Sequence, residues 1–131
     1  MTILGLDPGT RKCGVALVDA GVGRPLLLEI VPIGELERRL RAILASHPAE
    51  VAAIGRGTNA DAVAEVVRGL GLRSELVDER ETTLLARARF FADHPPRGWR
   101  RLVPRGMLLP DRPIDDYAAL LIAQRYLDSA R

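Results

Sequence analysis

Carboxylates stand at three points of the chain where a metal ion or a proton transfer could use them. Asp7 follows one apolar run, Asp78 and Glu79 follow another, and Asp115 and Asp116 open a third apolar pattern. Acids gathered in one place repel one another unless a hard cation lies between them, and oxygen ligands favour Mg²⁺ or Mn²⁺. Taken singly, each acid has a simpler interpretation as a turn residue, a helix cap or the partner of a helix dipole. Spacing alone leaves the two interpretations open.

The first acid must be positioned by a hairpin. The apolar run 3–6 leads Asp7 into a Pro8-Gly9 turn, and a second run rich in small and β-branched residues follows. A third strand is predicted over 26–31, so the first three strands form an antiparallel meander. An ionised carboxylate at the end of a buried strand is costly unless it is paired, hydrogen-bonded or bound to a metal.

Strands and helices alternate in the rest of the chain. Helices are predicted over 35–46, from an N-cap at Thr58 or Asn59 to about Leu70, and from 81 or 82 to 93, with strands at 50–54 and 74–77. The last helix is expected to have Pro113 in its first turn and to reach about Asp128. This alternation predicts parallel pairing added to the meander. The predicted fold is α/β, a mixed five-stranded sheet flanked by helices, in a single domain over 1–131.

The helix predicted before residue 93 has its apolar positions at Leu84, Leu85, Ala88 and Phe91. The strand that precedes it ends at Asp78 and Glu79. Because ligands gather outside the carboxyl ends of parallel strands, these acids can share a rim of the sheet with Asp7. The last helix can supply the third acid.

Length and composition exclude several classes of protein. The chain has 131 residues, 47% of them hydrophobic and 27% charged, which is typical of one globular domain. No apolar run approaches the roughly 20 residues that cross a bilayer, and no signal peptide is visible. The single cysteine, Cys13, cannot form an internal disulfide and is expected in the core, so a cytoplasmic location is predicted, with no membrane partner.

The basic residues are unevenly distributed. The net charge is only +2, but residues 93–112 contain a cluster of arginines against two acids, in a stretch with no clear period after residue 97: Arg97, Arg100, Arg101, Arg105 and Arg112. Phosphate contacts come chiefly from Arg and Lys, so Arg100 and Arg101 are predicted to hold a nucleic-acid backbone, with Trp99 stacked on an unpaired base. The alternative is that Trp99 pins the loop and the arginines are only solvated.

Three segments together resemble one family. The segment 3–19, Ile-Leu-Gly-Leu-Asp-Pro-Gly-Thr-Arg-Lys-Cys-Gly-Val-Ala-Leu-Val-Asp, is similar to the opening motif of the YqgF/RuvX family of RuvC-like nucleases. Residues 78–83, Asp-Glu-Arg-Glu-Thr-Thr, resemble its Asp-Glu-Arg-x-Thr-Thr segment, and residues 114–119, Ile-Asp-Asp-Tyr-Ala-Ala, resemble its Asp-x-x-Ala-Ala helix. The three segments occur in the family's order.

The resemblance implies a ribonuclease H-like fold with Asp7, Glu79 and Asp115 as catalytic and metal-binding acids. Asp115 is preferred to Asp116 because it stands three residues before Ala118. Two divalent ions, Mg²⁺ or Mn²⁺, would then activate the attacking water and stabilise the leaving oxygen. Three further residues are expected to contact the nucleic acid: Thr10, Arg11 and Arg80.

Family members are associated with maturation of the 5′ end of pre-16S ribosomal RNA, which is the expected role. A Holliday-junction-resolving DNA endonuclease of the same fold is the first alternative, and a symmetric cutter of this kind would act as a dimer. A nucleic-acid-binding module that no longer cuts is an alternative of another class. An actin-like ATPase ranks last, because such proteins close two domains over ATP and 131 residues cannot supply both. The expected partner is a nucleic acid, either RNA or branched or single-stranded DNA. The expected oligomeric state is a monomer or a homodimer.

Overall fold

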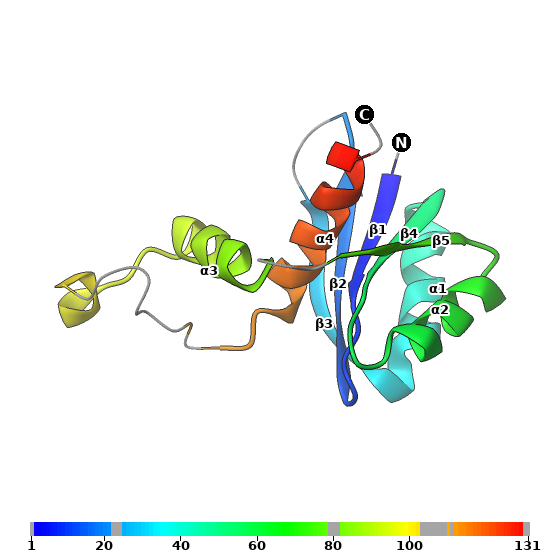
Figure 1. Cartoon of the computed structure of the whole chain (residues 1–131), viewed down its shortest axis with the longest axis horizontal. Coiled ribbons are helices and arrows are strands. Elements are labelled where there is room, and N and C mark those ends of the chain that lie inside the picture. The colour runs from blue at the N-terminus through cyan, green and yellow to red at the C-terminus, as the bar shows by residue number, and fades with distance from the viewer. Residues whose placement is uncertain (1, 22–24, 79–81, 103–109, 111, 130–131) are drawn as a thin grey trace.

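The computed structural model describes residues 2–21, 25–78, 82–102, 110 and 112–129. Five strands form one sheet in the order β3-β2-β1-β4-β5 (Figure 1). Their bounds are β1 Thr2–Asp7, β2 Lys12–Asp19, β3 Pro25–Pro32, β4 Val51–Gly55 and β5 Arg73–Val77. The helices are α1 Leu36–Ser46, α2 Ala60–Gly69, α3 Thr82–Asp93 and α4 Asp115–Ser129, with 3-10 helices η1 Ile33–Glu35 and η2 Gly98–Leu102.

The strand pairing is that of the predicted mixed sheet. Strand β1 pairs antiparallel with β2, and β2 pairs antiparallel with β3. On its other side β1 pairs in parallel with β4, which pairs in parallel with β5. The central strand β1 is therefore the point where the meander joins the parallel half, and its carboxyl end points toward the same rim as those of β4 and β5.

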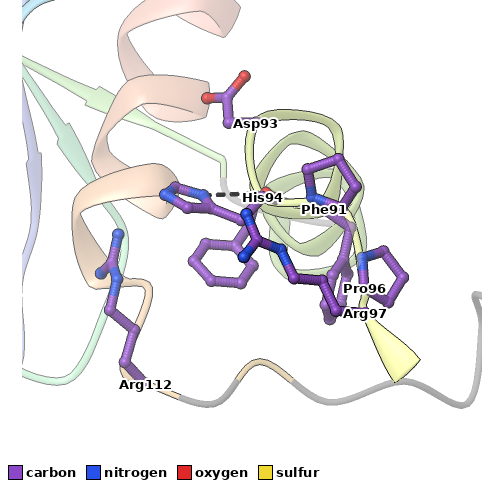
Figure 2. Close-up of a pocket in the computed structure, with 8 residues that line it drawn as sticks. Phe91, Asp93, His94, Pro96, Arg97 and Arg112 are labelled. Atoms are coloured by element: carbon purple, nitrogen blue, oxygen red, sulfur yellow. Dashed lines mark hydrogen bonds between the residues drawn. The ribbon is translucent and has the colours of Figure 1, made fainter. Parts of the chain in front are cut away.

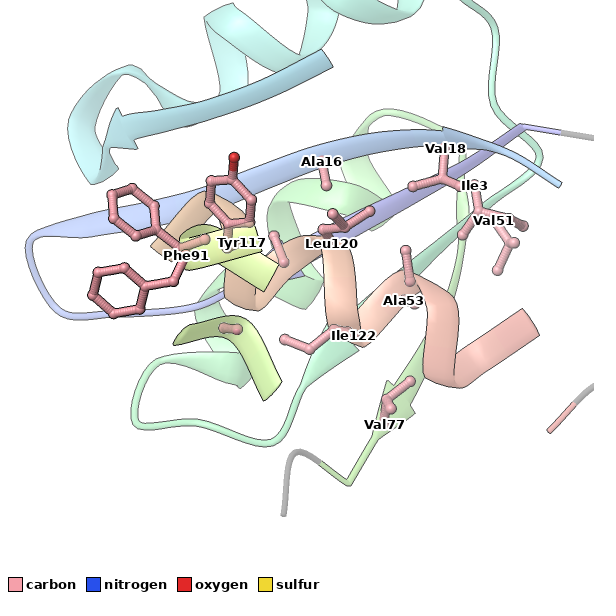
Figure 3. Packing of buried hydrophobic residues seen from close by; sticks show 14 residues of the cluster. Ile3, Ala16, Val18, Val51, Ala53, Val77, Phe91, Tyr117, Leu120 and Ile122 are labelled. Carbon is pink, nitrogen blue, oxygen red and sulfur yellow. The ribbon is translucent and has the colours of Figure 1, made fainter. Parts of the chain in front are cut away.

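Alternation along the strands gives the sheet two buried faces. In β1, Leu4 and Leu6 pack with α1 and α2, whereas Ile3 belongs to the cluster formed with α4 (Figure 3). The same division runs along β2, where Val15 and Ala16 fall on opposite faces. Because successive side chains point to opposite faces, Asp7 shares the α4 face with Ile3.

Two glycines let α4 lie directly on the sheet. A Cβ at Gly5 would stand 2.3 Å from the carbonyl oxygen of Ala119, and one at Gly14 would stand 1.8 Å from that of Asp115. No real Cβ contact is this short, so any larger residue would force the helix away. Because Gly14 has no side chain, the first residue of α4 can lie directly against β2.

Helix α3 lies on the far side of α4 from the sheet and, with η2, extends away from the body (Figure 1). Among its described side chains, which are those of residues 85–93, Ala86, Phe90 and Phe91 are buried, whereas Leu85 is 49% exposed and Ala88 is also exposed. Of the four apolar positions of the predicted helix, Phe91 is buried, Leu85 and Ala88 are exposed, and the side chain of Leu84 lies outside the described residues. The helix packs through a narrow stripe against α4, so its apolar residues did not all need a partner.

One helix start and one stretch predicted to be irregular differ from the sequence prediction, and one of the two predicted N-cap residues of α2 is confirmed. Helix α4 begins at Asp115, because the Ala118 N–H donates to the Ile114 carbonyl at 3.0 Å, and Pro113 precedes the helix. Asn59 is the N-cap residue of α2, but its side chain makes no capping hydrogen bond. Residues 98–102, predicted to be irregular, form the 3-10 helix η2. Among the described residues, no helix is long and apolar enough to cross a membrane.

Candidate active site

A depression of about 310 Å³ opens where β1 ends and α4 begins. We call it the acidic pocket, and it is lined by residues of the β1–β2 turn together with one residue of α4: Asp7, Pro8, Gly9, Thr10, Arg11, Lys12 and Asp115. Four of the residues predicted to form a site, Asp7, Thr10, Arg11 and Asp115, are thus brought together. Two carboxylates from opposite ends of the chain line the same pocket.

The sheet register explains why these two acids meet. Asp7 is the last residue of β1 and lies opposite Gly14 of β2. The backbone of Asp115 rests on Gly14, since a Cβ there would overlap the Asp115 carbonyl oxygen. One glycine therefore places the start of α4 beside the end of β1.

The β1–β2 turn, which follows Asp7, is held by hydrogen bonds from two sides. The side-chain amide of Asn59 donates to the Gly9 carbonyl at 3.0 Å, and the Ile33 N–H donates to the Arg11 carbonyl at 2.9 Å. A Cβ at Gly9 would stand 2.6 Å from the Lys12 carbonyl oxygen, so the turn also needs glycine there. Asn59 is a positioning residue that the sequence did not reveal, because its partner is distant in the chain.

Lys12 lines the pocket but was not predicted as a site residue. It is the one lysine of the chain, and its Nζ lies 3.3 Å from Oδ2 of Asp115. The two side chains are 44% and 32% exposed, so solvent screens the pair. Its place at the start of β2, beside the predicted acid Asp7, was the available signal.

The neighbouring acids of α4 have different surroundings. Asp116 is 6% exposed, accepts from the Tyr117 N–H at 3.0 Å, and faces the Arg112 guanidinium at 3.3 and 3.5 Å. Asp115 instead faces the acidic pocket and Lys12. Asp116 is engaged in holding the start of the helix, and Asp115 is the acid directed to the pocket.

Beneath the pocket lies Cys13, which is fully buried, as the sequence predicted for a core residue. Burial is the main cause that raises the pKa of its thiol to about 12, and the charges of Asp7 and Asp115 raise it further. A neutral thiol is a poor nucleophile, so at neutral pH Cys13 packs the site and does not attack.

Of the remaining predicted residues, Arg101 is the one whose side chain the structure describes, and it does not line this pocket. Glu79 and Arg80 lie outside the described residues, as do the side chains of Trp99 and Arg100. Arg101 is exposed on η2, in the segment that extends away from the body (Figure 1). Within the described ranges no three His, Cys, Asp or Glu side chains form a metal-binding group. The described part thus supplies two of the three expected acids.

The donor set of the acidic pocket suits a hard divalent cation. Asp7 and Asp115 offer carboxylate oxygens, which are the ligands that Mg²⁺ and Mn²⁺ prefer. The Lys12 ammonium lies 3.3 Å from one of these oxygens and offsets part of the negative charge. The residues present therefore fit a metal site.

Two curated proteins show what the chain is similar to. It is 34% identical to a protein named "Putative pre-16S rRNA nuclease" from Geobacillus thermodenitrificans, with 100% of each chain covered. It is 38% identical over 69 positions to the crossover junction endodeoxyribonuclease RuvC of Nocardioides sp., covering 43% of this chain and 39% of that protein. No protein-family model matches the chain.

Solved structures share the fold. RuvC of Thermus thermophilus, in complex with a Holliday junction substrate, superposes with a TM-score of 0.66 at 20% identity over 100% of this chain and 96% of that one. The Fowlpox virus resolvase bound to Holliday junction DNA gives 0.64 at 13% identity, over 99% of each chain. Identities this low establish the fold alone.

The sheet order, the helices on its two faces and these neighbours define a ribonuclease H-like, RuvC-like fold. The full-length relative narrows the class further: this chain belongs to the YqgF/RuvX family of RuvC-like nucleases. The fold and the family predicted from the three sequence segments are both confirmed.

Proposed function

We propose that this chain is a divalent-metal-dependent nuclease that hydrolyses phosphodiester bonds of structured nucleic acid, with Asp7, Glu79 and Asp115 as its catalytic acids. The observation that carries the proposal is the meeting of Asp7 and Asp115 in one pocket with three cationic or hydroxyl side chains: Thr10, Arg11 and Lys12. A site that joins carboxylates to phosphate-binding groups suits the cutting of a phosphodiester. A protein that only bound nucleic acid would gain from losing these negative charges.

The chain's own residues hold and orient the reactants. The three acids would hold Mg²⁺ or Mn²⁺, which on binding lowers the pKa of a water and offsets charge on the leaving oxygen. Arg11 and Thr10 are exposed at the rim, where they can donate hydrogen bonds to a phosphate. Arg80, Arg100 and Arg101 are proposed to contact the strand farther away. No side-chain nucleophile is needed.

The role that we favour is maturation of the 5′ end of pre-16S ribosomal RNA, in the cytoplasm. The full-length similarity to the Geobacillus protein supports this role over the alternative, because the similarity to RuvC covers 39% of RuvC. Resolution of four-way DNA junctions remains the second candidate, favoured by the fold shared with two junction-bound nucleases. It would require two active sites and hence a dimer.

The test is cleavage of three labelled substrates in Mg²⁺ or Mn²⁺. They are an RNA spanning the 5′ end of 16S ribosomal RNA with its leader, a single-stranded DNA of the same sequence, and a four-way DNA junction. Wild type is compared with Asp7→Asn and with Asp61→Asn, which changes an exposed acid on α2 as a matched control.

Metal-dependent cutting of the RNA by wild type and Asp61→Asn, with loss in Asp7→Asn, is the expected result. Preferred cutting of the junction would favour resolution of four-way DNA junctions over maturation of ribosomal RNA. Equal cutting by Asp7→Asn would show that the acidic pocket is not the active site. Tight binding without cutting on any substrate would identify a binding module.

A further inference from the structure

A second depression, of about 560 Å³, lies where the end of α3 meets the start of α4 (Figure 2). We call it the aromatic pocket. It is lined by aromatic, proline and charged side chains, none of which the proposed reaction uses: Phe90, Phe91, Asp93, His94, Pro95, Pro96, Arg97 and Arg112. Its composition differs from that of the acidic pocket, so it calls for a different kind of ligand.

The floor of this pocket is a stack of rings. The His94 imidazole lies on the Phe90 ring with centroids 4.6 Å apart and planes inclined by 21°. Phe90 is buried and meets Tyr117 edge to face at 5.6 Å, which anchors the stack to α4. Nδ1 of His94 lies 3.2 Å from the Phe90 carbonyl oxygen and fixes the ring's orientation. Since one face of His94 covers Phe90 and the residue is exposed, its other face is available to a flat group.

Two guanidinium groups stand beside the stack. Figure 2 shows the imidazole of His94 between the guanidiniums of Arg97 and Arg112 in that view. The Arg112 guanidinium is 5.1 Å from the Phe90 ring centroid and donates to the Pro113 carbonyl at 2.7 Å, so it is held in place. Guanidinium N–H groups in a fixed orientation match the oxygens of a phosphate.

The carboxylate in the pocket wall is already neutralised. Asp93 accepts from the Tyr117 hydroxyl at 2.9 Å and lies 3.6 Å from Nε of Arg89. The carboxylate that faces Arg112 belongs to Asp116, which is buried in the helix start. Arg112 is paired with Asp116 at 3.3 Å, so the positive charge beside the aromatic platform comes chiefly from the exposed Arg97. An aromatic ring next to a cationic group complements the base and the phosphate of a nucleotide.

The position of the pocket relates it to the proposed active site. Arg112 lies three residues before Asp115, and the adjacent acids divide between the two pockets. Asp115 faces Lys12 in the acidic pocket, whereas Asp116 faces Arg112 at the aromatic one. The two pockets therefore border the same helix start, within the five residues from Arg112 to Asp116.

We propose that the aromatic pocket binds one unpaired nucleotide of the strand being cut, with its base stacked on His94 and its phosphate held by Arg97 and Arg112. This inference rests on the proposed nuclease function and adds how the strand is gripped beside the cut. Every base has an aromatic face, so the pocket selects an unpaired nucleotide over a paired one and is tolerant of sequence.

The test is binding of a fluorescent single-stranded RNA by anisotropy, using the full chain in an Asp7→Asn background so that no cutting intervenes. Abasic residues are placed one position at a time along the RNA. In this background we compare the unaltered pocket with His94→Ala, with Arg97→Ala and with Arg68→Ala. Arg68 is the matched control, since it is an exposed arginine on α2, which covers the opposite face of the sheet.

With the pocket unaltered, one abasic position is expected to weaken binding about fivefold or more, as loss of a base stacked on an aromatic ring does. His94→Ala should weaken binding of the intact RNA similarly and abolish that abasic penalty, because both changes remove the same stack. Arg97→Ala, an exposed change that leaves the packing intact, should weaken binding of both RNAs, and Arg68→Ala should change neither.

An undiminished abasic penalty in His94→Ala, together with unchanged binding by Arg97→Ala, would overturn the pocket assignment. If cutting by the wild type still depended on Asp7, the proposed nuclease function would be kept and only the role of the aromatic pocket would be rejected. Failure of every variant to bind RNA, with no Asp7-dependent cutting, would overturn both.

Discussion

The two pockets on either side of the start of α4 are built in different ways. The acidic pocket rests on backbone geometry, namely the β1–β2 register, the contact of Asp115 with Gly14 and two hydrogen bonds that hold the turn. The aromatic pocket rests on side chains, since rings and guanidiniums at the end of α3 stack against α4. The acidic pocket is fixed by the sheet, and the aromatic pocket is carried by a helix at the edge of the body.

This difference assigns a separate task to each pocket. Chemistry on a phosphodiester needs groups held to a fraction of an ångström, and a sheet with close glycine contacts provides that. Gripping a strand tolerates more movement and draws on exposed cationic and aromatic side chains. Changes to the acidic pocket should therefore abolish cutting, and changes to the aromatic pocket should weaken binding.

The largest expected effect separates the neighbouring acids Asp115 and Asp116. Asp115→Asn should reduce cutting by at least about a hundredfold with little change in stability, because it removes a proposed metal ligand. Asp116→Asn should keep most of the cutting but lower the free energy of unfolding by about 1–2 kcal/mol, since it weakens the contact with half-exposed Arg112. Cleavage rates and urea unfolding of both variants provide the measurement, and the reverse pattern would contradict the assignment.

The next effect tests whether Gly14 holds α4 in place. Gly14→Ala puts a Cβ 1.8 Å from the Asp115 carbonyl oxygen, so the helix must shift, at a cost of about 3 kcal/mol. Gly69→Ala is the control: its Cβ would meet nothing within 4 Å, and the change should be neutral or stabilise by up to about 1 kcal/mol. Urea unfolding measures both. Equal stability of the two variants would contradict the inference that the contact at Gly14 places Asp115 beside Asp7.

Much of this arrangement was predictable from the sequence because its elements each bury one regular face. Helix α2 buries Val63 and Val67, which stand four residues apart on one helical face, and strand β1 alternates between two cores. Asp7 and the pair Asp115 and Asp116 were candidates because strand ends and helix starts mark the rim of such a sheet, and the family resemblance singled out Asp115. The sequence also contained the small residues Gly5 and Gly14, whose spacing could have indicated where α4 approaches the sheet.

What the sequence did not reveal depends on partners far away in the chain. The amide of Asn59 fitted a helix cap, but it donates to Gly9 in a different element. The ion pair of Lys12 likewise needs the folded position of Asp115. In α3, apolar residues occur on more than one side, so periodicity could not tell that Leu85 would be exposed and Phe90 buried. The aromatic pocket, which Phe90 and His94 help to form, was not predicted for the same reason.

A smaller effect follows from the buried thiol below the acidic pocket. The pKa of Cys13 is raised from its ordinary 9.0 to about 12. The folded chain therefore keeps the thiol proton at a pH where the unfolded chain loses it. This contribution is complete below pH 9 and is lost as the pH rises, by about 1.4 kcal/mol per unit above pH 9. In metal-free buffer, the free energy of unfolding of wild type should fall by about 2 kcal/mol more than that of Cys13→Ala between pH 8 and pH 10.5. Parallel pH dependence in urea titrations of the two proteins would contradict this.

The smallest expected effect concerns Lys12, whose ammonium stands beside Asp115 where a metal ion is proposed to bind. Lys12→Met keeps the stem of the side chain and removes its charge. Because the two side chains are 44% and 32% exposed, loss of the pair should change the free energy of unfolding by no more than about 0.5 kcal/mol. The affinity for Mn²⁺ should rise about two- to fivefold, since Asp115 no longer has a competing cation.

Calorimetric titration of Mn²⁺ into wild type, Lys12→Met and Lys12→Arg measures this difference, with Lys12→Arg as the variant that retains the charge. Weaker binding by Lys12→Met would mean that the ammonium supports the metal site through Asp115 and does not compete with it. Lys12 would then belong with Asn59 and Gly14 among the residues that hold the acidic pocket in shape. A rise in the affinity for Mn²⁺ would instead mean that Lys12 does not hold the pocket in shape. Its ammonium would then leave Asp115 when the metal binds and be free to contact the phosphate.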